Sequence, residues 1–154
     1  MRFLKVNVNP KKKKTGDCAV RAVVQACNIP YEQAAKELFD EWMRTGIDMT
    51  QTAVFKTVLE RHGFQAFGKP KHSDKTTYSV EQLGKKFGKG NILVVQVANH
   101  WTVIKDDKII DLWDCSMKSV YGYFIKKASS DEELKVYGGE ILESKTATGR
   151  RTRI

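Results

Sequence analysis

Three side chains of this sequence could together form a nucleophile and its base. Cys18 begins an apolar stretch that is typical of a helix, and the unpaired N–H groups at a helix start lower the pKa of a thiol. His100 and Asp111 fall in two alternating runs that flank the dipeptide Asp106-Asp107. A thiol beside an imidazole that is oriented by a carboxylate is an activated nucleophile. We therefore expect a Cys18 thiolate that attacks a carbonyl carbon.

The hairpin predicted over residues 100–113 brings the imidazole and the carboxylate together. If Asp106-Asp107 is a two-residue loop, Lys105 pairs with Lys108. Because strand side chains alternate with period 2, the hairpin then has a polar face and an apolar face. The polar face carries His100, Thr102, Asp111 and Trp113, and the apolar face carries Trp101, Val103, Ile110 and Leu112. His100 and Asp111 are diagonal neighbours within reach of each other.

The elements that must position these groups change from helices to strands along the chain. Apolar spacing predicts helices over residues 16–28, 31–45, 51–62 and 79–87. The first is apolar nearly all round, which indicates a buried helix, with Asp17 or Thr15 as its cap. Strands are expected over 64–67, 92–97, 100–104, 108–113 and 120–125, and a terminal strand is left open at 136–137 or 140–142. The layout is α+β, with an N-terminal helical part and its buried nucleophile helix packed on a C-terminal antiparallel meander.

Length and composition indicate one globular domain of 154 residues, with 41% hydrophobic and 29% charged side chains. We expect a basic segment over 1–14, one domain over 15–127 and a polar extension over 128–154 whose last ten residues lack order. The sequence has no apolar run long enough to cross a membrane, and three cysteines do not form a disulfide framework. These features favour a cytoplasmic protein without membrane partners.

The net charge of +9 resides in the two ends of the chain. Residues 1–14 carry +6 and residues 144–154 carry +4, whereas the residues between them carry −1. Such arms can bind the phosphates of a nucleic acid, or they can be solvated tails. The candidates for phosphate contact are Lys11, Lys12, Lys13, Lys14, Arg150, Arg151 and Arg153.

Two segments resemble the papain-like cysteine peptidase superfamily. GDCAVRA (16–22) is similar to its nucleophile helix, and NHWTVIKDDKIIDLWD (99–114) is similar to its hairpin of histidine and acid. The likeness is to the compact C39-like branch, and DKIIDLWDCS followed by VYGYF resembles small papain-like proteins of bacteria and phages. It covers roughly residues 15–125. The resemblance implies a papain-like fold, a peptide or protein substrate and no cofactor, with Cys18 as nucleophile, His100 as general base and acid, and Asp111 as orienter.

The sequence departs from this family before the nucleophile. The glutamine that such peptidases use in the oxyanion hole is absent, and losing one oxyanion donor typically costs about 10²–10³ in rate. Asn9, Asn7, Thr15 or backbone N–H groups are the candidate substitutes, and Trp113 is the candidate wall of the cleft. Asp17 would raise the pKa of the thiol unless its side chain points away as a cap.

Other functions remain open at this stage. The same fold could serve as an inactive protein-binding module, the same triad could transfer an acyl group from a thioester, and the basic ends could bind nucleic acid. No zinc site is expected, because the cysteines and histidines lack metal-ligand spacing. Cys27 is expected in the core, and Cys115 is expected as a surface thiol near the hairpin.

Overall fold

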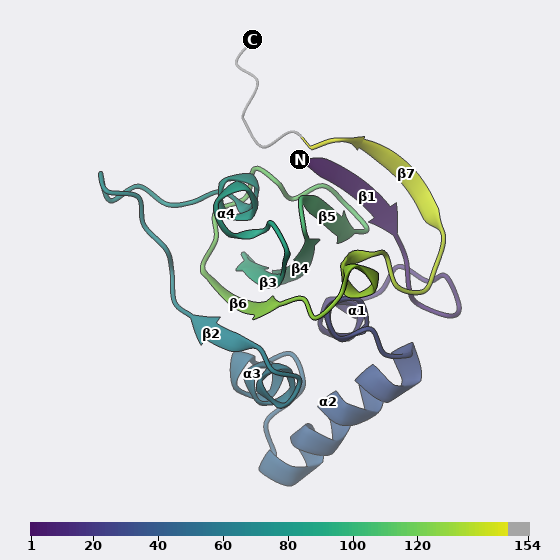
Figure 1. The fold of residues 1–154 in the computed structure, drawn as a ribbon. Coiled ribbons are helices and arrows are strands. Elements are labelled where there is room, and N and C mark those ends of the chain that lie inside the picture. Colours follow the sequence, from purple (N-terminus) through teal and green to yellow (C-terminus); the bar gives the residue numbers. More distant parts are fainter. Residues whose placement is uncertain (148–154) are drawn as a thin grey trace.

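A mixed sheet forms the centre of the fold, and helices cover both of its faces (Figure 1). The computed structural model describes residues 1–147. Over this range the strands are β1 (Arg2–Val6), β2 (Gln65–Phe67), β3 (Asn91–Val97), β4 (His100–Lys105), β5 (Lys108–Asp111), β6 (Gly122–Lys127) and β7 (Ile141–Thr146). Their order in the sheet is β2-β6-β3-β4-β5-β1-β7, and every neighbouring pair is antiparallel except β1 and β5.

The helices are α1 (Cys18–Cys27), α2 (Tyr31–Thr45), α3 (Thr52–Arg61) and α4 (Val80–Phe87), followed by a short 3₁₀ turn at Asp131–Leu134. These positions confirm the predicted α+β class. The predicted meander holds for β3, β4 and β5, whereas β6 returns to pair with β3. The predicted capping box of Ser79 and Gln82 is also present at the start of α4. Among residues 1–147, no helix has the length and apolar character to cross a membrane.

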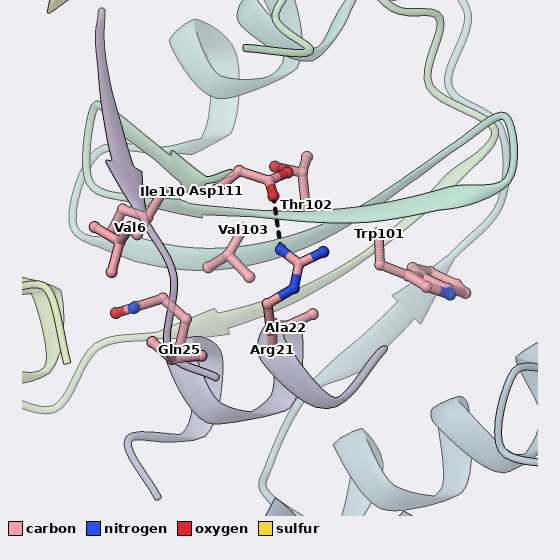
Figure 2. Close-up of a pocket in the computed structure, with 10 residues that line it drawn as sticks. Val6, Arg21, Ala22, Gln25, Trp101, Thr102, Val103, Ile110 and Asp111 are labelled. Carbon is pink, nitrogen blue, oxygen red and sulfur yellow. Dashed lines mark hydrogen bonds and ion pairs between the residues drawn. The ribbon is translucent and has the colours of Figure 1, made fainter. Parts of the chain in front are cut away.

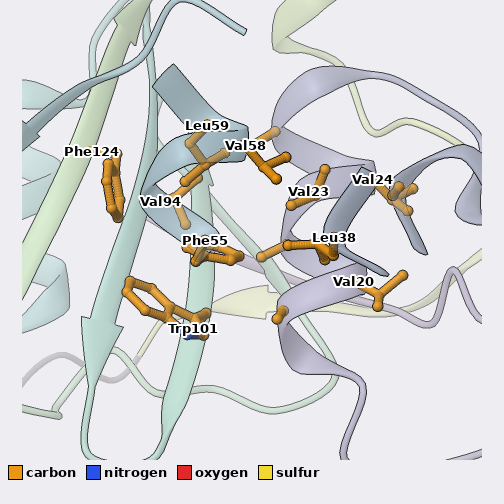
Figure 3. Close-up of a cluster of buried hydrophobic side chains, with 14 of the residues drawn as sticks. Val20, Val23, Val24, Leu38, Phe55, Val58, Leu59, Val94, Trp101 and Phe124 are labelled. Carbon is orange, nitrogen blue, oxygen red and sulfur yellow. The ribbon is translucent and has the colours of Figure 1, made fainter. Parts of the chain in front are cut away.

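The larger core lies between the sheet and helices α1 to α3 (Figure 3). Val23 of α1, Leu38 of α2 and Phe55 of α3 are fully buried there. The Phe55 ring stacks on Trp101 of β4 with ring centroids 4.2 Å apart. Because α1 packs against the sheet and against two helices, most of its faces are apolar, as predicted.

A second core lies on the other face of the sheet, under α4. Leu83 of α4 packs there with Leu93 of β3, Ile104 of β4 and Ile109 of β5. Ile104 pairs with Ile109 and Lys105 with Lys108, which confirms the predicted two-residue loop and register. The hairpin is therefore buried on both faces, and His100 and Asp111 lie at the end where β4 begins and β5 stops.

The basic N-terminal segment contains a strand that the sequence analysis did not predict. β1 runs parallel to β5, with Lys5 opposite Asp111, and antiparallel to β7. Phe3, Leu4 and Val6 are buried, so apolar side chains fix this segment in the sheet despite the lysines beside them.

The C-terminal extension is also attached to the sheet. Lys145 and Thr146 form the end of β7, although they belong to the ten residues expected to lack order. The remaining residues, 148–154, lie outside the described residues, and the candidate phosphate contacts Arg150, Arg151 and Arg153 lie with them.

Candidate active site

The structure brings Cys18 and His100 together from distant parts of the chain. Cys18 is the first residue of α1, and His100 is the first residue of β4, which packs against α1. The half-buried Cys18 and His100 line the same cleft, and interactions with the His100 side chain and the Trp101 backbone lower the pKa of the thiol. The start of the helix and the start of the strand thus meet at one point.

Asp111 holds the other side of the imidazole. The Nε2 atom of His100 lies 2.6 Å from Oδ2 of Asp111, and these two side chains are only 9% and 2% exposed. Because Nε2 is engaged by the carboxylate, Nδ1 is the ring nitrogen that remains for the thiol. The pairing across the hairpin is the one that its parity predicts.

The electrostatics favour a thiolate beside an imidazolium. Burial raises the pKa of the Cys18 thiol, but the hydrogen bonds from His100 and the Trp101 backbone and the charges of His100 and Arg21 outweigh it, and the pKa falls below its ordinary value. Burial also opposes the charge on His100, yet its hydrogen bonds to Asp111 and Cys18 raise its pKa to about 9. Both shifts stabilise the charged pair.

Arg21 of α1 holds the Asp111 carboxylate, as Figure 2 shows. It lies one turn after Cys18, and its Nη1 donates to Oδ1 of Asp111 at 3.2 Å. The backbone N–H of Leu112 donates to the same oxygen at 2.7 Å, which leaves Oδ2 for His100. The small cavity between these groups has a volume of about 20 Å³, which is close to that of one water molecule and too small for a substrate.

Asp17 completes a chain of buried charges. Its carboxylate accepts hydrogen bonds from Arg21 Nε at 2.8 Å, Tyr31 Oη at 2.8 Å and Asn9 Nδ2 at 3.1 Å. Burial raises the pKa of Asp17, but the hydrogen bonds from these partners and the charge of Arg21 outweigh burial and bring the pKa below its ordinary value. The carboxyl group therefore stays ionised. The prediction that Asp17 caps α1 is therefore wrong, because its side chain makes no hydrogen bond to the helix N–H groups. Arg21 compensates the negative charge of Asp17 beside the thiol.

Two open arms of one cleft meet at the thiol. Gly16, Cys18, Asn99 and His100 line both arms. One arm has a volume of about 440 Å³ and is otherwise lined by Ala19, Thr50, Gln51, Thr52, Gln96, Val97 and Trp101. The other has a volume of about 570 Å³ and is otherwise lined by Lys5, Lys14, Thr15, Arg21, Leu112 and Trp113.

The candidate oxyanion and cleft residues separate into two groups. Thr15 and Trp113 line the cleft, and the Trp113 ring lies 4.9 Å from the His100 ring. Asn9 does not line it, because its amide is bonded to Asp17. Asn7 is likewise turned inward, where its Nδ2 donates to the carbonyl of Lys13 at 3.0 Å.

Sequence reasoning missed three amide side chains that line the cleft, those of Gln51, Gln96 and Asn99. Asn99 stands directly before His100 in the turn between β3 and β4 and has a positive φ of 54°. An asparagine next to the candidate base in a two-residue turn was the available signal. The two glutamines gave no such signal, because only the packing of α3 and β3 brings them to Cys18.

The other two cysteines are in different environments. Cys115 is buried, not a surface thiol, and its Sγ lies 4.0 Å from Oδ2 of Asp111. His100, Asp111 and Cys115 have ligand atoms within 4.8 Å of one another. Burial and the charges of Asp111 and Asp114 raise the pKa of Cys115 to about 12, so it is a protonated thiol in this site. Cys27 packs against the larger core, and burial raises its pKa to about 12.

Comparison with known proteins adds no assignment, since no family model, no curated protein and no solved structure matches this chain.

Proposed function

We propose that this protein is a cysteine-dependent acyl-transfer enzyme, a peptidase that hydrolyses a peptide or isopeptide bond. The observation that carries the proposal is that Cys18 and His100 line the same cleft while the Asp111 carboxylate holds Nε2 of the His100 ring at 2.6 Å. A structural cysteine requires neither partner, whereas a nucleophile requires both.

The resemblance to papain-like peptidases supports the same proposal. A nucleophile at the start of a buried helix, an imidazole at the start of a strand and a carboxylate on the next strand occur in the chain order of that family. We therefore propose a papain-like arrangement around a mostly antiparallel sheet, with a peptide or protein as substrate.

The proposed reaction has two stages. The Cys18 thiolate attacks the carbonyl carbon, the C–N bond breaks, and the His100 imidazolium gives its proton to the departing amine. Water then attacks the thioester, and His100 takes a proton from that water. The C–S bond breaks, the acid product departs, and the sulfur leaves as the thiolate, which restores its ion pair with the His100 imidazolium. Asp111 keeps the ring oriented and stabilises its charged form throughout.

The oxyanion that develops in both stages needs N–H donors. The backbone N–H of Cys18 lies in the first turn of α1, where helix N–H groups have no helical partner. The amides of Asn99, Gln51 and Gln96 line the cleft beside it. We propose that a side-chain amide from this group takes the place of the missing glutamine.

The test is acylation of Cys18 by p-nitrophenyl acetate, followed by mass spectrometry of the Cys18 peptide. We expect a burst of p-nitrophenol and an acetyl group on Cys18 in the wild type. In His100→Ala the rate constant of the burst should fall by a factor of at least about 10², which is the usual contribution of a general base. His62→Ala is the matched control, because His62 pairs with Glu37 at 2.7 Å and does not line the cleft.

The proposal would be contradicted if Cys18 were acetylated no faster than the thiol of free glutathione and at the same rate in His100→Ala. It would instead favour the inactive protein-binding module.

A further inference from the structure

The two arms of the cleft differ in charge. Apart from the four residues that both arms share, the arm beside α3 has no charged lining residue among those described. The arm beside β1 is lined by Lys5, Lys14 and Arg21, and none of its described lining residues is acidic. A substrate that crosses Cys18 therefore meets a neutral surface on one side and a cationic surface on the other.

Lys5 and Lys14 provide the free charge of this arm. Arg21 is committed to Asp17 and Asp111. Lys5 and Lys14, in contrast, have no ion pair with any residue of the described range 1–147. Glu143 lies opposite Lys5 in the sheet, but its carboxylate pairs with Lys145 at 3.6 Å.

Both lysines are brought to the arm by the fold. Lys5 belongs to β1, where it lies opposite Asp111. Lys14 is exposed and follows a loop that is closed by two hydrogen bonds, from Asn7 Nδ2 to the carbonyl of Lys13 and from the Lys12 N–H to the carbonyl of Asn9. Both lysines therefore line the same arm as Cys18 and do not belong to a free tail.

We propose that this arm binds a carboxylate of the peptide substrate, supplied by an acidic side chain or by the C-terminus. The inference rests on the proposed function. Two unpaired ammonium groups beside a cleft attract an anion, and the ring of Trp113, 41% exposed, forms an apolar wall for the adjoining part of the substrate. The neutral arm, lined by Thr50 and Gln51, accepts an uncharged segment.

The first test compares alkylation of Cys18 by iodoacetate and iodoacetamide, which differ mainly in charge. Both rates are measured on the Cys18 peptide. The ratio of the iodoacetate rate to the iodoacetamide rate should be higher in the folded protein than in the urea-unfolded chain. In Lys14→Glu the ratio should fall about tenfold at low salt, and in Lys5→Gln about threefold, with smaller effects in 1 M NaCl. Lys11→Glu is the matched control, because Lys11 lies in the same basic run but does not line the arm.

The two reagents separate this inference from the proposed function. If iodoacetamide shows no activated thiol, the proposed function fails. If iodoacetamide shows an activated thiol but the ratio is the same in Lys14→Glu, Lys5→Gln and Lys11→Glu, the carboxylate-binding role of the cationic arm alone is overturned.

The second test identifies the carboxylate by protection of Cys18 from iodoacetamide. The probes are a pentapeptide with a central glutamate and an amidated C-terminus, the same peptide with glutamine and a free C-terminus, and an oligonucleotide of equal charge. Protection by either peptide that is lost in Lys14→Glu supports the inference and assigns the source. Protection by the oligonucleotide alone, or by none of the probes, overturns the assignment of a peptide carboxylate.

Discussion

The residues of the site depend on one another for their charge states. His100 is charged because Asp111 and the Cys18 thiolate flank it, and the thiolate persists because His100 and the Trp101 backbone donate to it. Between the lowered pKa of Cys18 and the His100 value of about 9, the ion pair is therefore the main form. Above that range His100 loses its proton, and the thiolate of Cys18 then has no imidazolium beside it to protonate the leaving amine.

The pH dependence of Cys18 alkylation checks this coupling. Iodoacetamide should label Cys18 with an apparent pKa below the ordinary value for a thiol. His100→Ala should raise it above that value, because burial remains after the favourable partner is lost. Cys27 and Cys115 serve as internal controls that stay unlabelled near neutral pH, since burial raises the pKa of each to about 12. Equal pH profiles in wild type and His100→Ala would exclude the ion pair.

Arg21 is a positioning residue, and its removal should act on Cys18 both through Asp111 and through the loss of its own charge near the thiol. Arg21→Gln leaves the carboxylates of Asp17 and Asp111 without their shared cation, so we expect a loss of about 3 kcal/mol in unfolding free energy and a higher apparent pKa for Cys18. The pKa is read from the alkylation profile, which a merely structural role would leave unchanged. Arg44→Gln, which removes an exposed partner of Glu41, is the control. A destabilised Arg21→Gln protein with an unaltered thiol profile would remove the positioning role.

At the scale of elements, local sequence patterns predicted the hairpin register and the buried helix, which both depend on neighbouring residues. The alternation of residues 100–113 fixed the pairing of Lys105 with Lys108, and the apolar composition of 16–28 indicated a buried helix with Cys18 near its start. The bond from Arg21 to Asp111 joins residues 90 positions apart, so no local pattern contained it. The Asp17 side chain was assigned to the wrong partner because Tyr31 and Arg21 compete with the helix N–H groups for its carboxylate.

A buried lysine joins three of the elements. Lys105 at the end of β4 is fully buried, and its Nζ donates to Gln25 Oε1 at 3.0 Å, Asn28 Oδ1 at 2.7 Å and the carbonyl of Lys135 at 2.9 Å. Gln25 also exchanges two hydrogen bonds with the backbone of Tyr137. The strand, the end of α1 and the C-terminal extension are thus fastened at one ammonium group.

Lys105 should give the protein a recognisable pH dependence of stability. Burial lowers its pKa to about 7, so between pH 7 and the unfolded value of 10.5 the unfolded chain binds more protons, and the free energy of unfolding rises with pH. His100 acts in the opposite direction, since its raised pKa gives stability that is full below 6.5 and lost through about 9. The difference between wild type and Lys105→Met isolates the lysine and should grow by up to about 1.4 kcal/mol per pH unit in urea unfolding. A difference that does not change from pH 7 to 10 would contradict the lowered pKa.

At the scale of the whole molecule, the N-terminal segment connects the sheet to the site. β1 joins β5 to β7 and carries Lys5 to the cleft, and the chain that leaves β1 supplies Lys14 before it reaches Cys18. Sequence reasoning assigned residues 1–14 by their charge, because four consecutive lysines dominate the composition of the segment. The three buried side chains of β1 show that its apolar residues decide its place in the fold.

Phe3 tests this role of the segment. Its side chain is 2% exposed and packs in the core under α4, so Phe3→Ala should lower the free energy of unfolding by about 3–5 kcal/mol. Phe39→Ala makes the same chemical change at a site on α2 that is 47% exposed, and its cost should stay within about 0.5 kcal/mol. Because β1 also carries Lys5 to the cleft, the iodoacetate-to-iodoacetamide ratio at Cys18 should fall toward the unfolded value in Phe3→Ala alone. Equal stabilities of the two variants in urea unfolding would mean that residues 1–14 are an appended basic arm and that the cleft does not depend on β1.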